Sequence, residues 1–154
     1  MNDLWAAVAR NDSKEITRLL DAGFDPNTKD SDGRTALMHA AIDGKDELAE
    51  LLIGRRSNLN AQDDRGFSAL HFAAQNYRVK VAESLLRAGA TVDIRDEFGN
   101  TPLWRAVFNS QGRGEIIKLL LGHGADRQAK NKSGKSPVDL ANTIGNYDVK
   151  QFFS

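Results

Sequence analysis

Apolar residues follow two alternating patterns along most of the chain. A Thr or Ser precedes a short apolar run, as Thr35 does before Ala36 and Leu37, and its hydroxyl can cap the free amides at the start of a helix. After a short polar turn a second stretch follows, in which apolar residues recur with a period of about 3.6, the stripe of an amphipathic helix. Examples are Leu48, Leu51 and Leu52, then Val81 and Leu85, then Ile116 and Leu120. The pattern predicts successive pairs of helices, each with one polar side.

The helix pairs recur at a fixed interval that is marked by Gly33, Gly66, Gly99 and Gly134. Successive glycines are separated by 33, 33 and 35 residues, and after one intervening residue each is followed by Thr or Ser, then Ala or Pro, then Leu or Val. One pair of helices cannot bury its apolar face alone, whereas stacked neighbours share a continuous core. We therefore expect an elongated array of stacked units, with its stability spread along the array.

This pattern resembles that of ankyrin repeats, whose 33-residue unit carries the signature Thr-Pro-Leu-His-x-Ala. The resemblance covers the chain from Asn2 to its last residues. It implies an all-α repeat fold, an α-solenoid of helix-turn-helix units joined by β-hairpin-like loops. We expect five units in a single domain over residues 1–154, the first and last of them truncated. They are an N-terminal cap (1–29), full repeats (30–62, 63–95 and 96–130) and a C-terminal cap (131–154) that stops within its second helix.

Glycine also ends the second helix of three units, where a left-handed backbone conformation is needed. These glycines are Gly23, Gly89 and Gly124. Arg56 stands at that position in the remaining unit, which should cost about 1 kcal/mol unless a contact compensates. Tyr77 similarly takes the place of Gly44 in the turn between the two helices. The next unit lengthens this turn around Ser110 and Gln111, and we favour neutral drift as the reason because loop extension is thermodynamically inexpensive.

Composition excludes several classes of function. The chain has no cysteine, so disulfide scaffolds, thiolate nucleophiles and cysteine-based zinc sites are absent. No apolar stretch approaches the roughly 20 residues of a membrane span, and no hydrophobic targeting segment follows Met1. We therefore expect a soluble, cytoplasmic protein that does not enter membranes. We also expect it to be monomeric when free. The formal net charge is zero, which disfavours binding to nucleic acid through counterion release.

Charge is nevertheless distributed unevenly along the chain. Residues 1–112 contain 14 Lys and Arg against 17 Asp and Glu, a net charge of −3, whereas residues 113–154 contain 7 against 4, a net charge of +3. Such an asymmetry can orient an association electrostatically.

The titratable residues give little support to an enzymatic or metal-binding role. His71 occupies the signature histidine position, where the imidazole usually bonds backbone groups of the capping turn, and neither His39 nor His123 shares a metal-ligand spacing with it. Acidic residues recur in each full unit at the expected hairpin tips, and we interpret them as turn caps rather than as a catalytic or calcium cluster. They are Asp32, Asp63, Asp64, Asp96 and Glu97. We predict a protein that is not an enzyme and that has no metal and no cofactor.

The ankyrin resemblance implies a protein partner, bound through the hairpin tips and the concave inner face of the first helices. Positions that vary among family members supply most of the candidate binding residues. The candidates are Asp32, Arg34, Asp64, Arg65, Phe67, Gln75, Asn76, Glu97, Phe98, Asn100, Trp104, Arg105, Phe108, Lys132 and Lys135.

Aromatic residues distinguish the middle of this strip. Phe67 and Phe98 stand at two hairpin tips, where turns do not require them, and Trp104, Arg105 and Phe108 belong to the helix that follows the second tip. Clusters of aromatic residues and arginine are typical of interface hot spots. Trp104 is also large enough to pack across the seam between units, so both packing and binding stay open for it.

A narrower resemblance involves the C-terminal part of the chain. Residues 104–108, 112–117 and 146–153 look like small standalone bacterial ankyrin proteins, many of which are found beside secreted polymorphic toxins. That likeness implies an immunity protein that binds a cognate toxin tightly in the cytosol. The alternative is a cytosolic adaptor or regulatory scaffold for a housekeeping protein. Affinity separates the two, because an adaptor tolerates micromolar binding and an immunity protein does not.

Overall fold

The computed structural model describes residues 3–145 and 147–154, so Asn2 and Asn146, which belong to the resemblances above, lie outside the described residues. Within them every regular element is a helix. The α-helices are α1 (Asp3–Arg10), α2 (Ser13–Asp21), α3 (Ala36–Asp43), α4 (Asp46–Gly54), α5 (Ala69–Gln75), α6 (Val79–Arg87), α7 (Pro102–Phe108), α8 (Glu115–Gly122) and α9 (Pro137–Thr143), and they are followed by the 3-10 helix η1 (Lys150–Phe153).

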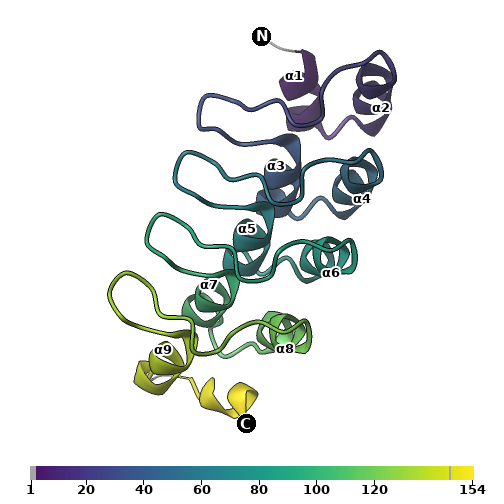
Figure 1. Cartoon of the computed structure of the whole chain (residues 1–154). Coiled ribbons are helices and arrows are strands. Elements are labelled where there is room, and N and C mark those ends of the chain that lie inside the picture. The colour runs from purple at the N-terminus through teal and green to yellow at the C-terminus, as the bar shows by residue number, and fades with distance from the viewer. Residues whose placement is uncertain (1–2, 146) are drawn as a thin grey trace.

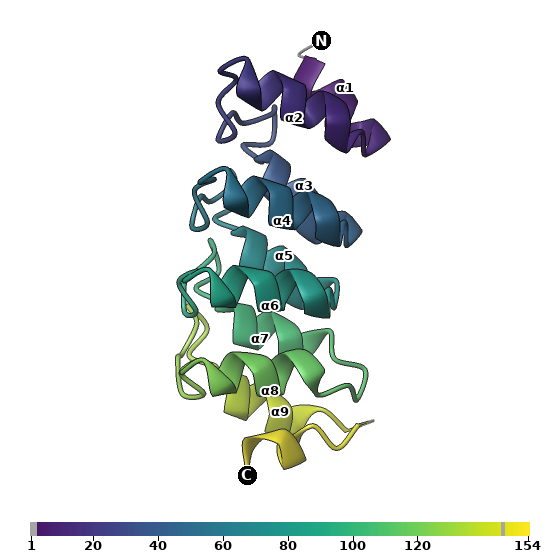
Figure 2. The same cartoon turned by 90° about the vertical axis from the view of Figure 1, so that its right-hand side faces the viewer.

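The helices form two columns (Figure 1). Helices α1, α3, α5, α7 and α9 stack in one column and α2, α4, α6 and α8 in the other, while long loops project from the first column on the side away from the second. Figure 2 shows the array from the side of the second column, with the helices in chain order. The predicted all-α repeat stack is therefore confirmed, and the hairpin-like loops contain no β-strand in the part of the chain that the structure describes.

Hydroxyl side chains start the first helix of four units, as the sequence predicts. The side-chain oxygen of each accepts a hydrogen bond from the backbone N–H three residues later, at 3.1–3.3 Å. The four residues are Thr35, Ser68, Thr101 and Ser136. Each bond satisfies one of the amides that a helix start leaves free, and losing such a cap typically costs about 1 kcal/mol.

One apolar core runs through the whole array. Leu37, Leu70 and Leu103 occupy equivalent positions in successive units, and none is more than 1% exposed. The alanines of the same helices are also buried, which lets the first column pack closely. The stacking expected from the period is thus present, and it holds α3, α5 and α7 at fixed positions beside the loops.

Backbone hydrogen bonds join neighbouring loops to one another. In three successive pairs, an N–H of the later loop donates to a carbonyl of the earlier loop at 2.9–3.1 Å. The pairs are Asp64 with Asp32, Glu97 with Arg65, and Lys132 with Phe98. Gly99 shows why the tips need glycine, since its φ is 75° and a Cβ there would lie 2.9 Å from the nitrogen of Lys132.

Two larger residues adopt the left-handed conformation that glycine has elsewhere. The φ angles of Arg56 and Tyr77 are 59° and 56°. The Tyr77 hydroxyl donates to the carbonyl of Arg113, and the Arg113 guanidinium lies 4.0 Å from the ring centre. Burial, and then the nearby Glu115 carboxylate, raise the pKa of Tyr77 to about 12, so the hydroxyl keeps its proton. Arg56 is exposed, and its side chain makes no hydrogen bond or ion pair with the described residues, so its strain is not compensated.

We expect Arg56→Gly to raise the free energy of unfolding by about 1 kcal/mol, because glycine adopts this backbone conformation without steric cost. Arg56→Ala is the matched control: it removes the long side chain but keeps the strain, so its stability should equal that of the unchanged chain. Urea denaturation of the three proteins measures the difference. A glycine variant less stable than the unchanged chain would reveal a stabilising role for the arginine side chain.

The last unit differs from the others in its second half. The sequence predicts part of a second helix there, and the structure has the 3-10 helix η1 in its place. Val149 is fully buried and Phe153 is 9% exposed, so both pack inward. Phe152 is half-buried and lies against Gly114 at the start of α8. Aromatic packing therefore closes this end of the core, although no α-helix forms.

Candidate protein-binding surface

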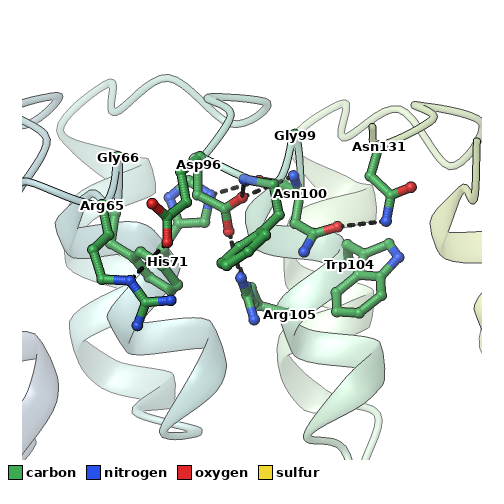
Figure 3. Close-up of polar contacts among 12 residues, drawn as sticks. Arg65, Gly66, His71, Asp96, Gly99, Asn100, Trp104, Arg105 and Asn131 are labelled. Atoms are coloured by element: carbon green, nitrogen blue, oxygen red, sulfur yellow. Dashed lines mark hydrogen bonds and ion pairs between the residues drawn. The ribbon is translucent and has the colours of Figure 1, made fainter. Parts of the chain in front are cut away.

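Five candidate residues gather where the loops before α5 and α7 meet the first helix column. They are Arg65, Phe67, Phe98, Trp104 and Arg105, which we call the aromatic–arginine cluster. Figure 3 shows Arg65 on the side of α5, Trp104 on the side of α7, and Arg105 between them. The cluster therefore lies in the middle of the array, on the face that the loops border.

Arg105 is fixed at the centre of the cluster by a buried ion pair. Its Nε and Nη2 atoms lie 3.0 and 2.7 Å from Oδ2 of Asp96. The Asp96 side chain is 0% exposed and that of Arg105 is 14% exposed. The other carboxylate oxygen accepts from the backbone N–H groups of Phe98 and Asn100, at 2.9 and 3.0 Å. Asp96 thus joins the loop to α7 and leaves Arg105 little freedom.

Three aromatic rings surround the Arg105 guanidinium. Its carbon lies 4.7 Å from the centre of the Phe67 ring, 5.6 Å from Trp104 and 5.7 Å from Phe98. A cation over an aromatic face is attracted by about 0.5–2 kcal/mol, more when water is excluded. Arg65 adds a second guanidinium, 5.5 Å from the Phe98 ring centre, while its Nε donates to Glu97 at 2.7 Å. Cation and rings therefore hold each other in place.

One Asp or Asn residue of each loop acts as a turn cap. In four loops, Oδ1 of an Asp or Asn accepts from the backbone N–H groups two and four residues later, at 2.9–3.0 Å. The four residues are Asp30, Asp63, Asp96 and Asn131. The turn interpretation is confirmed for Asp63 and Asp96, whereas Asp32 and Asp64 are exposed tip residues without this role. Asp30 and Asn131 could have been identified because each stands three residues before a periodic glycine.

An acidic turn residue also pairs with the residue nine positions later in two units. The Asp96–Arg105 pair has a counterpart in Asp30 and His39, whose Oδ2 and Nε2 atoms are 2.7 Å apart. Burial opposes ionisation of Asp30, but His39 and two backbone N–H groups hold its pKa below the usual value. Phe72 occupies this position in the unit between them, so Asp63 has no such partner in its own unit. Instead, Nε of Arg34 from the preceding loop lies 3.4 Å from Oδ2 of Asp63.

His71 has the structural role expected from its position. A backbone N–H can only donate, so the bond of 3.2 Å from Ser68 N–H makes Nδ1 an acceptor, and Nε2–H must donate to the Asn100 carbonyl at 2.8 Å. Burial lowers the pKa of His71, which keeps the imidazole neutral. No group of three or more His, Asp or Glu side chains that could hold a metal ion occurs within residues 3–145 and 147–154.

The aromatic candidates differ in exposure. Phe98 and Phe108 are 45% and 59% exposed, and Trp104 is half-buried with its ring stacked on Phe108 at 5.3 Å. Phe67 requires a correction: the sequence places it at an exposed tip, but it is only 6% exposed and stacks on Phe72 beneath Arg105. Asn100 is likewise buried at 4% exposure, and its Oδ1 accepts from the Asn131 side chain at 2.8 Å. These two residues support the surface from below.

The remaining candidates lie along the same strip. Gln75 and Asn76 are half-buried at the end of α5, where Asn76 Nδ2 donates to the Phe72 carbonyl at 2.9 Å. Lys132 and Lys135 are exposed on the loop before α9. The strip thus carries charges of both signs on the N-terminal side of its aromatic centre and two lysines on the C-terminal side.

Three hollows lie along the strip. One of about 170 Å³ opens within the cluster beside Phe67 and Arg105, and one of about 430 Å³ lies between α7 and the loop before α9. A third, of about 410 Å³, lies at the N-terminal end and is lined by Trp5, His39 and Asp43 among others. The sequence did not indicate this third hollow, which is formed by residues of two different units.

Comparisons with known proteins agree with the architecture. Residues 4–96 match a family model described as ankyrin repeats in three copies, and residues 98–132 match the model of a single ankyrin repeat. Human SH3 and multiple ankyrin repeat domains protein 2 is 32% identical to the chain over 148 residues, which cover 96% of this chain and 8% of that protein. The chain therefore spans only a small part of that relative's length.

None of the helices in the described residues could cross a membrane. Ankyrin repeats generally mediate protein–protein interactions, and proteins built from them are typically non-catalytic. This chain belongs to the ankyrin repeat family, as shown by its repeat period, its stacked helix pairs and the two model matches.

Proposed function

We propose that the chain binds one protein partner through the aromatic–arginine cluster and the loops beside it. The observation that carries this proposal is the combination, at one place, of exposed Phe98 with an arginine that Asp96 and three rings hold rigid. Aromatic and arginine side chains dominate interface hot spots, and side chains that are already ordered lose less entropy on binding.

The more specific form of the proposal is a bacterial immunity protein that neutralises a cognate toxin in the cytoplasm. Support comes from the likeness of residues 104–108, 112–117 and 146–153 to small standalone ankyrin proteins found beside toxins. Bound to the toxin domain, the chain would cover the active site or a surface that the toxin needs. Separated charges of opposite sign, −3 in residues 1–112 and +3 in residues 113–154, would orient and speed the encounter.

The experiment uses the candidate toxin, which is the protein encoded by the gene next to that of this chain. Calorimetry measures its affinity for the purified chain, and a growth assay shows whether co-expression of the chain protects cells from that protein. An immunity protein should bind at about nanomolar Kd or tighter, near −12 kcal/mol, and should restore growth. Micromolar binding without protection would instead favour a cytosolic adaptor with a housekeeping partner. If Glu83→Ala on the exposed side of α6 weakened binding as much as changes in the cluster do, the proposed surface would be wrong.

A further inference from the structure

The hollow of about 430 Å³ is lined by basic and aromatic residues, which together favour one kind of ligand. We call it the lysine pocket, after Lys132 and Lys135 on the loop before α9. Phe98 and Trp104 form its aromatic wall, and Arg105 and Asn131 also line it. No carboxylate is among its lining residues, although Asp or Glu stands at the tips of the three preceding loops.

Both lysines contribute positive charge that the chain does not neutralise. Their side chains are exposed, and no ion pair forms at either ammonium group within the residues that the structure describes. Arg105, by contrast, is neutralised by Asp96. The nearby Asp139 has its pKa lowered chiefly by hydrogen bonds from Ser136 and less by Lys135, and its Oδ2 already accepts from the Ser136 backbone at 2.9 Å.

The indole N–H of Trp104 is a second feature that requires an acceptor. This nitrogen is buried and has no hydrogen-bond partner among the described residues, an arrangement that is unfavourable in a folded protein. Figure 3 shows the indole on the side that faces Asn131. Oδ1 of Asn131 accepts from two backbone N–H groups at 3.0 Å, and Oδ1 of Asn100 accepts from Asn131 at 2.8 Å. The amide oxygens beside the indole are therefore already engaged.

We propose that the lysine pocket binds the carboxylate of an Asp or Glu side chain from an acidic segment of the protein partner. The two ammonium groups pair with the carboxylate, and an apolar neighbour in the segment packs on Phe98. A small rotation of the indole brings its buried N–H to the pocket surface, where it can donate to the carboxylate. This inference rests on the proposed function. A nucleic acid fits less well, because the two unpaired cations of the pocket stand on one loop and offer no extended track for successive phosphates.

The test uses the peptide N-acetyl-Glu-Leu-Glu-Leu-Glu-amide and its counterpart with Gln in place of each Glu. The chain has two tryptophans, so in a Trp5→Phe background the fluorescence of Trp104 reports binding at the pocket. We expect the Glu peptide to bind about ten-fold more tightly than the Gln peptide. The double variant Lys132→Gln/Lys135→Gln should remove that preference. Lys14→Gln/Lys80→Gln, which removes two exposed lysines outside the pocket, should keep it.

Equal affinity for the two peptides, or no binding by about 10 mM, would overturn the inference. So would tighter binding of a thymidine pentanucleotide than of the Glu peptide, which would indicate phosphate recognition. A partner that binds the Lys132→Gln/Lys135→Gln variant as tightly as the unchanged chain would also reject the pocket, and it would leave the proposed function intact. Circular dichroism and the melting temperature of each lysine variant should match the unchanged chain, since all four side chains are exposed.

Discussion

Arg105→Met should lower the free energy of unfolding by about 3–5 kcal/mol, because it leaves the fully buried Asp96 carboxylate without its cation. Methionine fills a similar volume, so the loss reports the charge more than the packing. Attraction between the guanidinium and the three surrounding rings disappears as well. Urea denaturation with a linear extrapolation measures the change.

Arg65→Met is the matched control for this change. Arg65 also contacts the Phe67 and Phe98 rings and pairs with Glu97, but its side chain is 60% exposed. Exposed pairs contribute little, so its loss should stay within about 1 kcal/mol. The double variant Arg105→Met/Asp96→Asn should recover part of the stability lost in Arg105→Met, since no buried charge remains. Equal losses in Arg105→Met and Arg65→Met would show that Asp96 does not depend on Arg105.

Phe98→Ala should weaken binding of the partner by about 2 kcal/mol, roughly 30-fold in Kd. The melting temperature should stay close to that of the unchanged chain. Phe98 is 45% exposed, and the hydrogen bond that joins its loop to the next uses its backbone carbonyl, which the substitution keeps. Calorimetry with the protein encoded beside this chain gives the affinity, and thermal denaturation gives the stability.

Phe67→Ala supplies the contrast. Phe67 is 6% exposed, so its truncation should cost about 3–5 kcal/mol of stability, as expected for a core phenylalanine. A large fall in the melting temperature of Phe98→Ala with unchanged affinity would mean that Phe98 also belongs to the core and does not contact the partner.

The repeat itself was predictable because its period fixes both turn geometry and packing. Periodic glycines mark positive φ angles at the tips, and Thr35 and its counterparts mark helix starts. The error at Phe67 has a local cause. Phe98 stands one position before its glycine, at the tip of its loop, whereas Phe67 stands one position after, immediately before Ser68, which caps α5. The chain at Phe67 therefore already enters the helix column. Sequence position at the tip was therefore too coarse a guide to exposure.

Contacts between units were harder to predict than contacts within one. The Asp96–Arg105 pair could have been found, since an acidic residue and a base stand nine positions apart in two units. The aromatic enclosure of Arg105 could not, because Phe67 belongs to the preceding unit and reaches Arg105 only through the stacking of α5 on α7. The lysine pocket likewise needs two units, and its identification depends on a missing acceptor that no sequence displays.

Each unit packs only on its immediate neighbours, and this arrangement determines which part of the array opens first. The outermost helix pairs have a neighbour on one side only, so fraying and tension on the two ends should detach them before the middle. Arg105, Phe98 and Trp104 sit around α7, away from the first pair and tied into the loops on both sides. A partner bound at Phe98 and Arg105 would therefore stay bound while the first helix pair opens, and its residence time on this surface would depend on the units around α5 and α7.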